Sequence, residues 1–177
     1  FRRYFRNRIG GQSLIAVDAP PALEDNPRFV RVAQLFQDAG VRTPRVLDQD
    51  FEQGFLLLDD FGDDLYLYSL WAAQLDHNLA LADELYRQAI DTLIDIQGGI
   101  DKKRLDPYDR NELHQELVLF DQWFCGELLG LNLSADEQQL VAETYSLLED
   151  KALAQPAVAV HRDYHSRNLM IVNPGPG

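Results

Sequence analysis

The sequence predicts an α+β protein in which a β-rich segment comes first and a mainly helical segment follows. Two observations support this prediction. In residues 1–60, short runs rich in aromatic and β-branched residues alternate with turns that contain glycine or proline. After about residue 80, apolar residues recur every three or four positions along three stretches. We therefore expect two parts, residues 1–60 and residues 61–177.

The first part is expected to contain five strands and one helix. Gly10-Gly11 supplies a hairpin turn after an opening that alternates aromatic and basic side chains. Asp25 or Asn26 is expected to cap the helix, with Pro27 at its first position. Gly40 is expected to end it. The runs that suit strands are residues 1–8, 13–17, 46–47 and 55–58, of which the last would be the fifth strand.

The second part follows a connector near residues 59–64 and is expected to be helical. Residues 82–94 carry one apolar stripe, and residues 113–128 carry another. Ser134 and Glu137 form a capping box before a third stripe that ends near residue 148.

The bulk composition excludes several classes of partner. A formal net charge of −13 argues against general nucleic-acid binding, which needs a basic surface. No apolar run approaches the roughly 18 residues of a membrane span, so no membrane partner is expected. The single cysteine, Cys125, excludes an internal disulfide and fits a reducing cytoplasm.

The most informative stretch is residues 161–168, His-Arg-Asp-Tyr-His-Ser-Arg-Asn. The short apolar runs on either side, residues 157–160 and 169–172, are expected to be strands that hold a loop between them. Asp163 and Asn168 would then converge on one tight loop. Phosphoryl transfer uses such a pair, because a carboxylate accepts the proton of the attacking hydroxyl and an amide oxygen helps to hold a divalent ion. The alternative is that both are ordinary turn residues.

This order of elements, ending in that loop, resembles the protein-kinase-like phosphotransferases, and within them the aminoglycoside phosphotransferase and choline kinase branch. The resemblance covers essentially the whole chain. Three segments, Phe1-Arg2-Arg3-Tyr4-Phe5-Arg6, Asp18-Ala19-Pro20-Pro21 and residues 54–62, are similar to bacterial kinases that phosphorylate N-acetylmuramate and N-acetylglucosamine at the anomeric hydroxyl during cell-wall recycling. The resemblance implies a bilobal kinase-like fold, ATP and Mg²⁺ as cofactors, an amino-sugar substrate and a cytoplasmic location.

The resemblance also indicates that this fold is truncated at both ends. The first residue is not Met and already lies in a strand-like pattern, while residues 173–177 form a turn with no partner strand after it. A glycine-rich loop is expected before Phe1, and a second metal-binding aspartate after Gly177. The chain as given is therefore expected to bind MgATP poorly and to be nearly inactive.

The resemblance assigns roles to the loop residues. Asp163 is expected to be the catalytic base and Asn168 the magnesium ligand. His161 is expected to fix the loop rather than to bind a metal. Arg167 either anchors the loop or contacts phosphate, and it is kept among the candidate substrate residues.

The triplet Asp60-Phe61-Gly62 is similar to the metal-binding triplet of kinases but stands in the wrong place. It precedes the loop by about a hundred residues, whereas the metal-binding triplet should follow the loop. Leu58, Asp59, Asp60 and Phe61 are expected instead to form the nucleotide hinge, which meets the adenine edge with backbone groups.

The third strand of such folds ends in a lysine that neutralises nucleotide phosphates, and here Asp18 takes its place. A carboxylate beside a polyphosphate needs a compensating cation. Strand alternation lets either Arg3, or Arg2 together with Arg6, face the cleft, and Arg3 is our nucleotide-binding candidate. The missing lysine leaves a non-catalytic, kinase-shaped nucleotide-binding protein as an alternative.

Candidate sugar ligands lie on the helix expected near residues 112–128. Glu112, Glu116 and Trp123 fall on one face of it. Carboxylates accept hydrogen bonds from sugar hydroxyls, and an indole can stack on a pyranose ring. Asp121 points away from this face but stands in a family-like neighbourhood. The alternative is a solvated acidic edge with a half-buried tryptophan.

Together these features predict an ATP-dependent phosphotransferase that acts on a small-molecule hydroxyl, with the anomeric hydroxyl of N-acetylmuramate or N-acetylglucosamine as the leading acceptor. An aminoglycoside or choline-type kinase would share the same loop, so the loop does not exclude it. A cationic substrate would suit the acidic surface, whereas N-acetylmuramate would need a local basic group.

Overall fold

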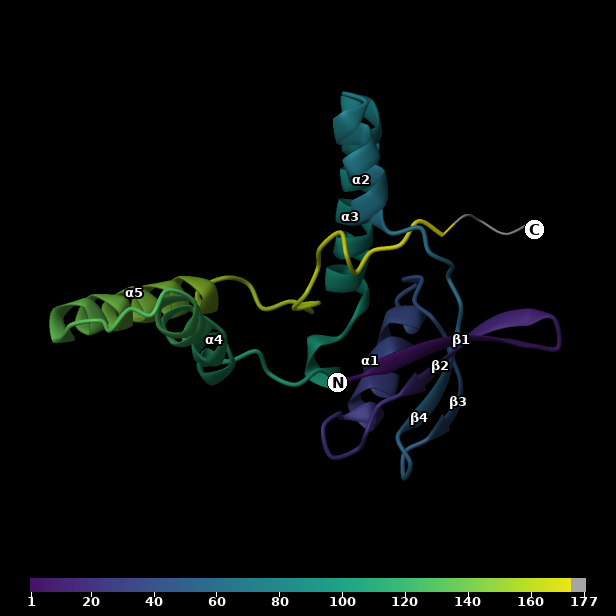
Figure 1. The fold of residues 1–177 in the computed structure, drawn as a ribbon, viewed down its shortest axis with the longest axis horizontal. Coiled ribbons are helices and arrows are strands. Elements are labelled where there is room, and N and C mark those ends of the chain that lie inside the picture. Colours follow the sequence, from purple (N-terminus) through teal and green to yellow (C-terminus); the bar gives the residue numbers. More distant parts are fainter. Residues whose placement is uncertain (173–177) are drawn as a thin grey trace. The chain divides into compact units, whose positions relative to one another are not determined.

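The computed structural model describes residues 1–172 and divides the chain into two compact units (Figure 1). One unit comprises Phe1–Asp101 together with the segment from Ala159 onward, and the other comprises Lys102–Val158. Strands and helices are both present, so the α+β prediction is confirmed. The boundary expected after residue 60 stays a prediction.

A four-stranded antiparallel sheet with the order β1-β2-β4-β3 forms the β-rich part of the first unit (Figure 1). Its strands are β1 (Arg3–Ile9), β2 (Gln12–Asp18), β3 (Val46–Asp50) and β4 (Phe55–Asp59). The central strands are in register at Val17, which pairs with Tyr4 on one side and with Leu56 on the other. The prediction of five strands is wrong for the described residues. The four strand-like runs of residues 1–60 each take one place in the sheet, and no further run remains to pair.

The buried face of the sheet forms a core with helix α1 (Asn26–Asp38). Leu56 and Leu58 alternate with more exposed neighbours along β4, as a half-buried strand requires. Val17 lies beside them, and Phe29 packs against this cluster from α1. Helix α1 therefore depends on the sheet for the burial of its apolar side.

Helix α1 begins and ends as the sequence predicts. The side chain of Asp25 accepts a hydrogen bond from the Arg28 N–H at 3.0 Å, and Pro27 lies in the first turn. After the last turn Gly40 has a φ of +80°, the left-handed conformation that commonly ends helices.

The turn between β3 and β4 requires glycine at position 54. Gly54 has a φ of +78° and accepts a hydrogen bond from the Ala19 N–H at 2.8 Å. A Cβ atom there would lie 2.3 Å from the Ala19 carbonyl oxygen. The backbone of the segment after β2 thus approaches the turn too closely for any side chain.

Helices α2 (Tyr66–Leu75) and α3 (Leu79–Gly99) pack side by side in the first unit (Figure 1). Helix α3 confirms the helix predicted over residues 82–94, although Tyr86, Ile90 and Ile94 of its apolar stripe are exposed. Helix α2 was not predicted from the sequence, for two reasons. Leu65 caps it without a side-chain hydrogen bond, and its apolar residues are not confined to one face.

The second unit contains a short 3₁₀ turn (Lys102–Arg104), α4 (Arg110–Leu117), the π-helix η2 (Phe120–Leu128) and α5 (Ala135–Leu153). The single helix predicted over residues 113–128 is wrong, because the backbone changes to π-type bonding: the Leu129 N–H reaches back five residues to the Phe124 carbonyl. The capping box is confirmed, since Ser134 and Glu137 each accept a hydrogen bond from the other's N–H. None of the helices within residues 1–172 is long and apolar enough to cross a membrane.

Candidate active site

The loop at residues 161–168 is attached to the start of α2. Met170 forms an antiparallel bridge with Leu65. Beside the bridge, the Tyr66 N–H donates a hydrogen bond to the Leu169 carbonyl at 2.9 Å. Segments about a hundred residues apart in the sequence thus meet through their backbones, within the first unit.

The two strands predicted on either side of the loop are not formed. Residues 157–160 contain no strand, and residues 169–172 contribute only the bridge at Met170. The hairpin prediction is wrong because the second run is hydrogen-bonded to residues 64–66 instead, through the Leu169 carbonyl and the Ile171 N–H. The turn predicted at residues 173–177 lies outside the described residues.

Side chains of the loop anchor it to two helices. The His161 ring stacks on Phe36 of α1 at a centroid distance of 5.8 Å and meets Tyr164 edge-on at 5.4 Å. The Tyr164 hydroxyl donates a hydrogen bond to the Ala89 carbonyl of α3 at 2.5 Å. Arg162 has a φ of +72°, a left-handed conformation that costs energy for a residue with a side chain. The surrounding contacts hold the loop in this strained form.

The His161 ring packs against neighbouring aromatic rings and is partly buried. Burial lowers the pKa of His161 from its ordinary value of 6.5, although the nearby Asp163 carboxylate acts in the opposite direction. The imidazole is therefore neutral at pH 7. Among the described residues, its buried Nδ1 has no hydrogen-bond partner. This position suits the predicted loop-fixing role, which stays a prediction.

Asp163 and Asn168 converge in the loop. The Asn168 Nδ2 donates hydrogen bonds to Asp163 Oδ2 at 2.6 Å and to the Asp163 carbonyl at 3.0 Å. The amide nitrogen is thus turned toward Asp163, which turns the acceptor atom Oδ1 away from it. The Asp163 side chain is 70% exposed, so a small alcohol can reach it.

The donor set of this loop fits a magnesium ion. Magnesium prefers oxygen ligands and keeps several of its waters, so one protein oxygen such as Asn168 Oδ1 is a suitable contact when phosphates supply others. Within residues 1–172, no group of three or more His, Cys, Asp or Glu side chains is placed to hold a metal ion. The amide oxygen is therefore the metal-binding candidate to test.

His165 is a candidate that the sequence analysis did not assign. Its Nε2 lies 2.9 Å from Asp163 Oδ1. Its Nδ1 accepts a hydrogen bond from the backbone N–H of Arg167 at 3.2 Å. The only sequence signal was a histidine two positions after the candidate base, because hydrophobic periodicity carries no information about loop side chains.

The hinge candidates lie at the end of β4. Leu58 is buried in the core, and Asp59 pairs with Arg45 through a contact of 2.7 Å from Oδ2 to Nε. The strand ends at Asp59. The following backbone groups, those of Asp60 and Phe61, are the ones that the hinge prediction assigns to adenine.

The side chain of Asp60 is engaged in the fold. Its Oδ2 accepts hydrogen bonds from the Ser13 hydroxyl and from Arg6 Nε, each at 2.6 Å, and its Oδ1 accepts one from the Gly62 N–H at 2.9 Å. The hydrogen bond from Ser13, and after it the contact with Arg6, lower the pKa of Asp60, against the effect of burial. This carboxylate ties β1 and β2 to the segment that follows β4.

Arg3 and Asp18 stand directly opposite each other in the β1–β2 register and form an ion pair. The negative charge that takes the place of the strand-three lysine is thereby paired with a cation on the neighbouring strand. Arg2 pairs with Glu24 at 3.0 Å, and Arg6 is held by the acidic segment after β4. Arg3 stays a predicted nucleotide contact.

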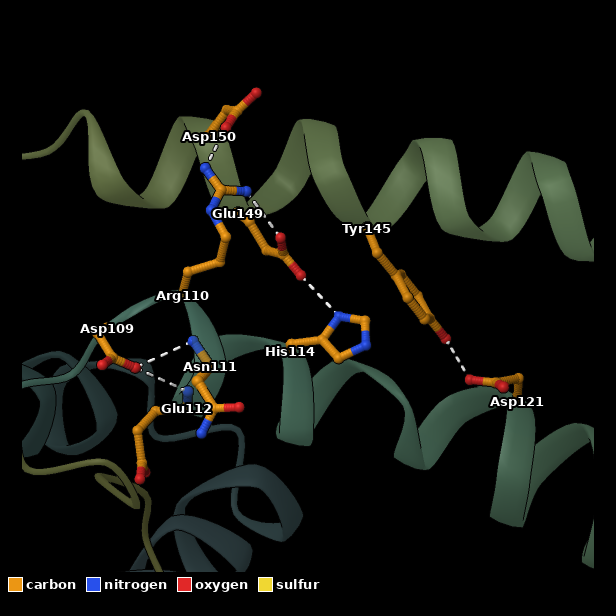
Figure 2. Close-up of polar contacts among 9 residues, drawn as sticks. All are labelled: Asp109, Arg110, Asn111, Glu112, His114, Asp121, Tyr145, Glu149 and Asp150. Carbon is orange, nitrogen blue, oxygen red and sulfur yellow. Dashed lines mark hydrogen bonds and ion pairs between the residues drawn. The ribbon is translucent and has the colours of Figure 1, made fainter.

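A polar cluster joins α4 to α5 in the second unit (Figure 2). The buried Glu149 accepts hydrogen bonds from Arg110 Nη1 at 2.8 Å and from His114 Nδ1 at 2.9 Å. Arg110 also pairs with the more exposed Asp150. The hydrogen bond from His114, followed by that from Arg110, holds the pKa of Glu149 below its ordinary value. The cluster therefore contains a buried carboxylate that is charged at neutral pH.

Three candidate sugar residues lie in this second unit. Tyr145 donates a hydrogen bond to Asp121 Oδ1 at 2.8 Å (Figure 2), and the Tyr108 hydroxyl donates one to Glu116. The Trp123 ring is exposed. Because α4 gives way to a π-helix before Trp123, the 3.6-residue spacing that placed it on the face of Glu116 does not apply across both.

The loop has the residues that the sequence resemblance leads one to expect of a phosphotransferase, and comparison with known proteins identifies the same family. The Phosphotransferase enzyme family matches residues 1–177. The chain belongs to this family, so the resemblance seen in the sequence is confirmed.

Three individual relatives are similar to the chain over its whole length. The chain is 45% identical over 177 residues to the N-acetylmuramate/N-acetylglucosamine kinase of Pseudomonas aeruginosa, and 41% identical over 177 residues to the protein of that name from Pseudomonas putida. It is 35% identical over 178 residues to the protein of that name from Neisseria meningitidis serogroup B. Each match covers 100% of this chain but 50%, 50% and 52% of the respective relatives. The chain thus spans about half the length of these relatives.

Proposed function

We propose that the protein transfers the γ-phosphoryl group of ATP to the anomeric hydroxyl of an amino sugar, N-acetylmuramate or N-acetylglucosamine, in the cytoplasm. The observation that supports phosphoryl transfer is the pairing of an exposed Asp163 with Asn168 in one anchored loop. The names of the relatives support the choice of acceptor.

In this proposal Asp163 accepts the proton of the acceptor hydroxyl. The sugar oxygen bonds to the γ-phosphorus while the bond from that phosphorus to the leaving oxygen of ADP breaks, and the proton passes to the Asp163 carboxylate. Asn168 would hold magnesium through Oδ1. The metal, when bound, neutralises charge on the phosphates.

The proposed nucleotide contacts use the backbone at the end of β4. The side chains of Leu58, Asp59 and Asp60 are occupied in the fold, which leaves main-chain groups of the segment through Phe61 for the adenine edge. Arg3, by holding the charge of Asp18, removes a repulsion that the phosphates would otherwise meet.

The proposed acceptor contacts are Glu116, Asp121, Trp123 and Arg167. Carboxylates and an exposed indole suit a pyranose, and a guanidinium suits the carboxylate of N-acetylmuramate. The hydrogen bond from Tyr145 sets the orientation of Asp121 before any ligand binds.

Two other functions are each favoured by one observation. The net charge of −13 favours a cationic acceptor such as an aminoglycoside or choline. Asp18, in place of the phosphate-binding lysine, favours a non-catalytic nucleotide-binding protein.

A coupled assay on the full-length protein separates these functions. N-acetylmuramate, N-acetylglucosamine, kanamycin and choline are offered with MgATP, and turnover of at least one sugar is expected. No turnover of either sugar would eliminate the sugar-kinase proposal. Asp163→Asn should lower kcat by about a hundredfold or more, as expected for loss of a positioned base. Asp95→Asn, the same change at an exposed position of α3, is the matched control and should leave kcat unchanged.

A further inference from the structure

The two ring nitrogens of His165 have different partners, and these define its tautomer. Nδ1 accepts a hydrogen bond from the Arg167 N–H at 3.2 Å, and only a ring nitrogen without a proton can accept one. In the neutral imidazole the proton therefore lies on Nε2. Nε2 lies 2.9 Å from Asp163 Oδ1 and 3.5 Å from the Asn168 amide nitrogen, so the protonated Nε2 donates its hydrogen bond to the nearer carboxylate oxygen.

The Asp163 carboxylate is consequently held from both sides. His165 donates to Oδ1 and Asn168 donates to Oδ2, so rotation of the carboxylate would break at least one bond. The restraint matters because the Asp163 side chain is 70% exposed and has little packing to fix its rotamer. Each oxygen keeps a second lone pair that can accept another proton donor.

His165 is itself fixed by the turn. Its carbonyl accepts a hydrogen bond from the Asn168 N–H at 2.9 Å, and the next carbonyl, that of Ser166, accepts one from the Leu67 N–H of α2 at 3.1 Å. The imidazole therefore stands on an anchored backbone, and its hydrogen bond holds the Asp163 carboxylate relative to that backbone.

We propose that His165 is a positioning residue that orients the Asp163 carboxylate toward the acceptor hydroxyl, a role that rests on the proposed phosphoryl transfer. Correct orientation of a base lowers the barrier of the chemical step without strengthening ground-state binding. Loss of the Nε2 contact should therefore lower kcat roughly ten- to hundredfold and leave KM for the sugar and for ATP nearly unchanged.

Two amide variants separate positioning from support of the loop. His165→Gln places an N–H donor near Nε2 and can restore the contact with Asp163. His165→Asn places an acceptor near Nδ1, so it can preserve the hydrogen bond with the Arg167 N–H but is too short to reach Asp163. The proposal expects Gln to retain most of kcat and Asn to lose it. Near-normal kcat in Asn together with loss in Gln would show a merely structural histidine and overturn the proposal.

A spectroscopic measurement tests the contact without turnover. Nitrogen-15 NMR of the histidine rings in the full-length protein, assigned with His165→Gln, should show His165 as the Nε2–H tautomer. An Nδ1–H tautomer would refute the proposal.

The outcomes of the two proposals are distinguishable. If the wild-type protein phosphorylates neither sugar, the proposed function fails, while the tautomer still decides whether His165 faces Asp163 as a donor. If the wild type is active and Asp163→Asn is inactive, the ranking of the Gln and Asn variants decides on the positioning role alone.

Discussion

The hydroxyl of Tyr145 on α5 donates a hydrogen bond to the carboxylate of Asp121 on the π-helix η2, at 2.8 Å. Tyr145 is buried, so its hydroxyl depends on Asp121 as a partner. The proposed sugar ligand Asp121 therefore also has a structural role, and loss of this bond should be detectable in the absence of substrate.

Tyr145→Phe should lower the free energy of unfolding by about 1 kcal/mol at neutral pH, because Asp121 loses its hydrogen-bond donor. Burial, and then the Asp121 carboxylate, raise the pKa of Tyr145 from 10.0 to about 12. A raised pKa means that the folded state favours the protonated phenol. The contribution is thus complete below pH 10 and is lost as the pH rises through about 12.

Urea unfolding of the wild type and Tyr145→Phe across this range checks the prediction. The difference between the two proteins should shrink with rising pH. Tyr86→Phe, at an exposed site on α3, is the control for removal of a tyrosine hydroxyl. A difference that stays constant through pH 12 would contradict the assigned pKa.

Glu149→Gln should destabilise the protein far more than Asp150→Asn. Both carboxylates bind Arg110, but only Glu149 is buried and also bound by His114. Removal of a buried charge partner leaves the others without compensation, whereas exposed pairs contribute little. Thermal unfolding of the two variants at neutral pH provides the comparison, and equal shifts in Tm would contradict it.

The comparison of the wild type with Glu149→Gln also predicts how stability depends on pH. Because the pKa of Glu149 is lowered in the folded protein, its stabilising contribution is present above the ordinary value of 4.5 and is lost as the pH falls through the lowered value. The Tm difference between the wild type and Glu149→Gln should therefore diminish toward acid pH.

Asn168→Ala should raise the magnesium concentration needed for half-maximal rate by about tenfold or more, because an oxygen ligand is lost. Asn168→Asp keeps an oxygen at the same distance along the side chain and should need less magnesium than the Ala variant. The measurement is the rate at saturating ATP across a magnesium titration of the full-length protein. An unchanged magnesium requirement in Asn168→Ala would exclude the residue as a ligand.

Gly54→Ala and Gly10→Ala separate steric clash from backbone conformation. Both glycines have positive φ, +78° and +59°, but only Gly54 faces an atom that a Cβ would strike. Gly10→Ala should cost about 1–2 kcal/mol, the usual penalty for a left-handed residue with a side chain. Gly54→Ala should cost several kcal/mol more, since the Ala19 carbonyl would have to move. Urea unfolding of both variants tests the ranking.

Features determined by near neighbours in the chain could be predicted from the sequence. The caps at Asp25 and Ser134 depend on donors and acceptors within three residues. The convergent Asp163 and Asn168 are also near neighbours, five residues apart in the chain. Long-range pairing could not be predicted. A four-residue apolar run such as 169–172 does not specify its partner, and here that partner is the segment around residue 65.

Side-chain contacts that depend on the final backbone conformation could not be predicted from the sequence either. The contact between His165 and Asp163 depends on the loop conformation, and the ion pair of Arg3 with Asp18 depends on strand register. The π-helix η2 was missed because hydrophobic spacing does not distinguish it from a continuation of α4.

The bridge between Leu65 and Met170 has a mechanical consequence. Only residues 62–64 separate it from the proposed adenine-binding segment, residues 58–61. The segment proposed to bind the purine is therefore connected by a short stretch of backbone, through the bridge, to the segment that follows the loop of the proposed base, Asp163. If both proposals hold, a nucleotide that displaced the adenine-binding segment would also displace the loop of Asp163, so nucleotide binding and alignment of the base would be coupled.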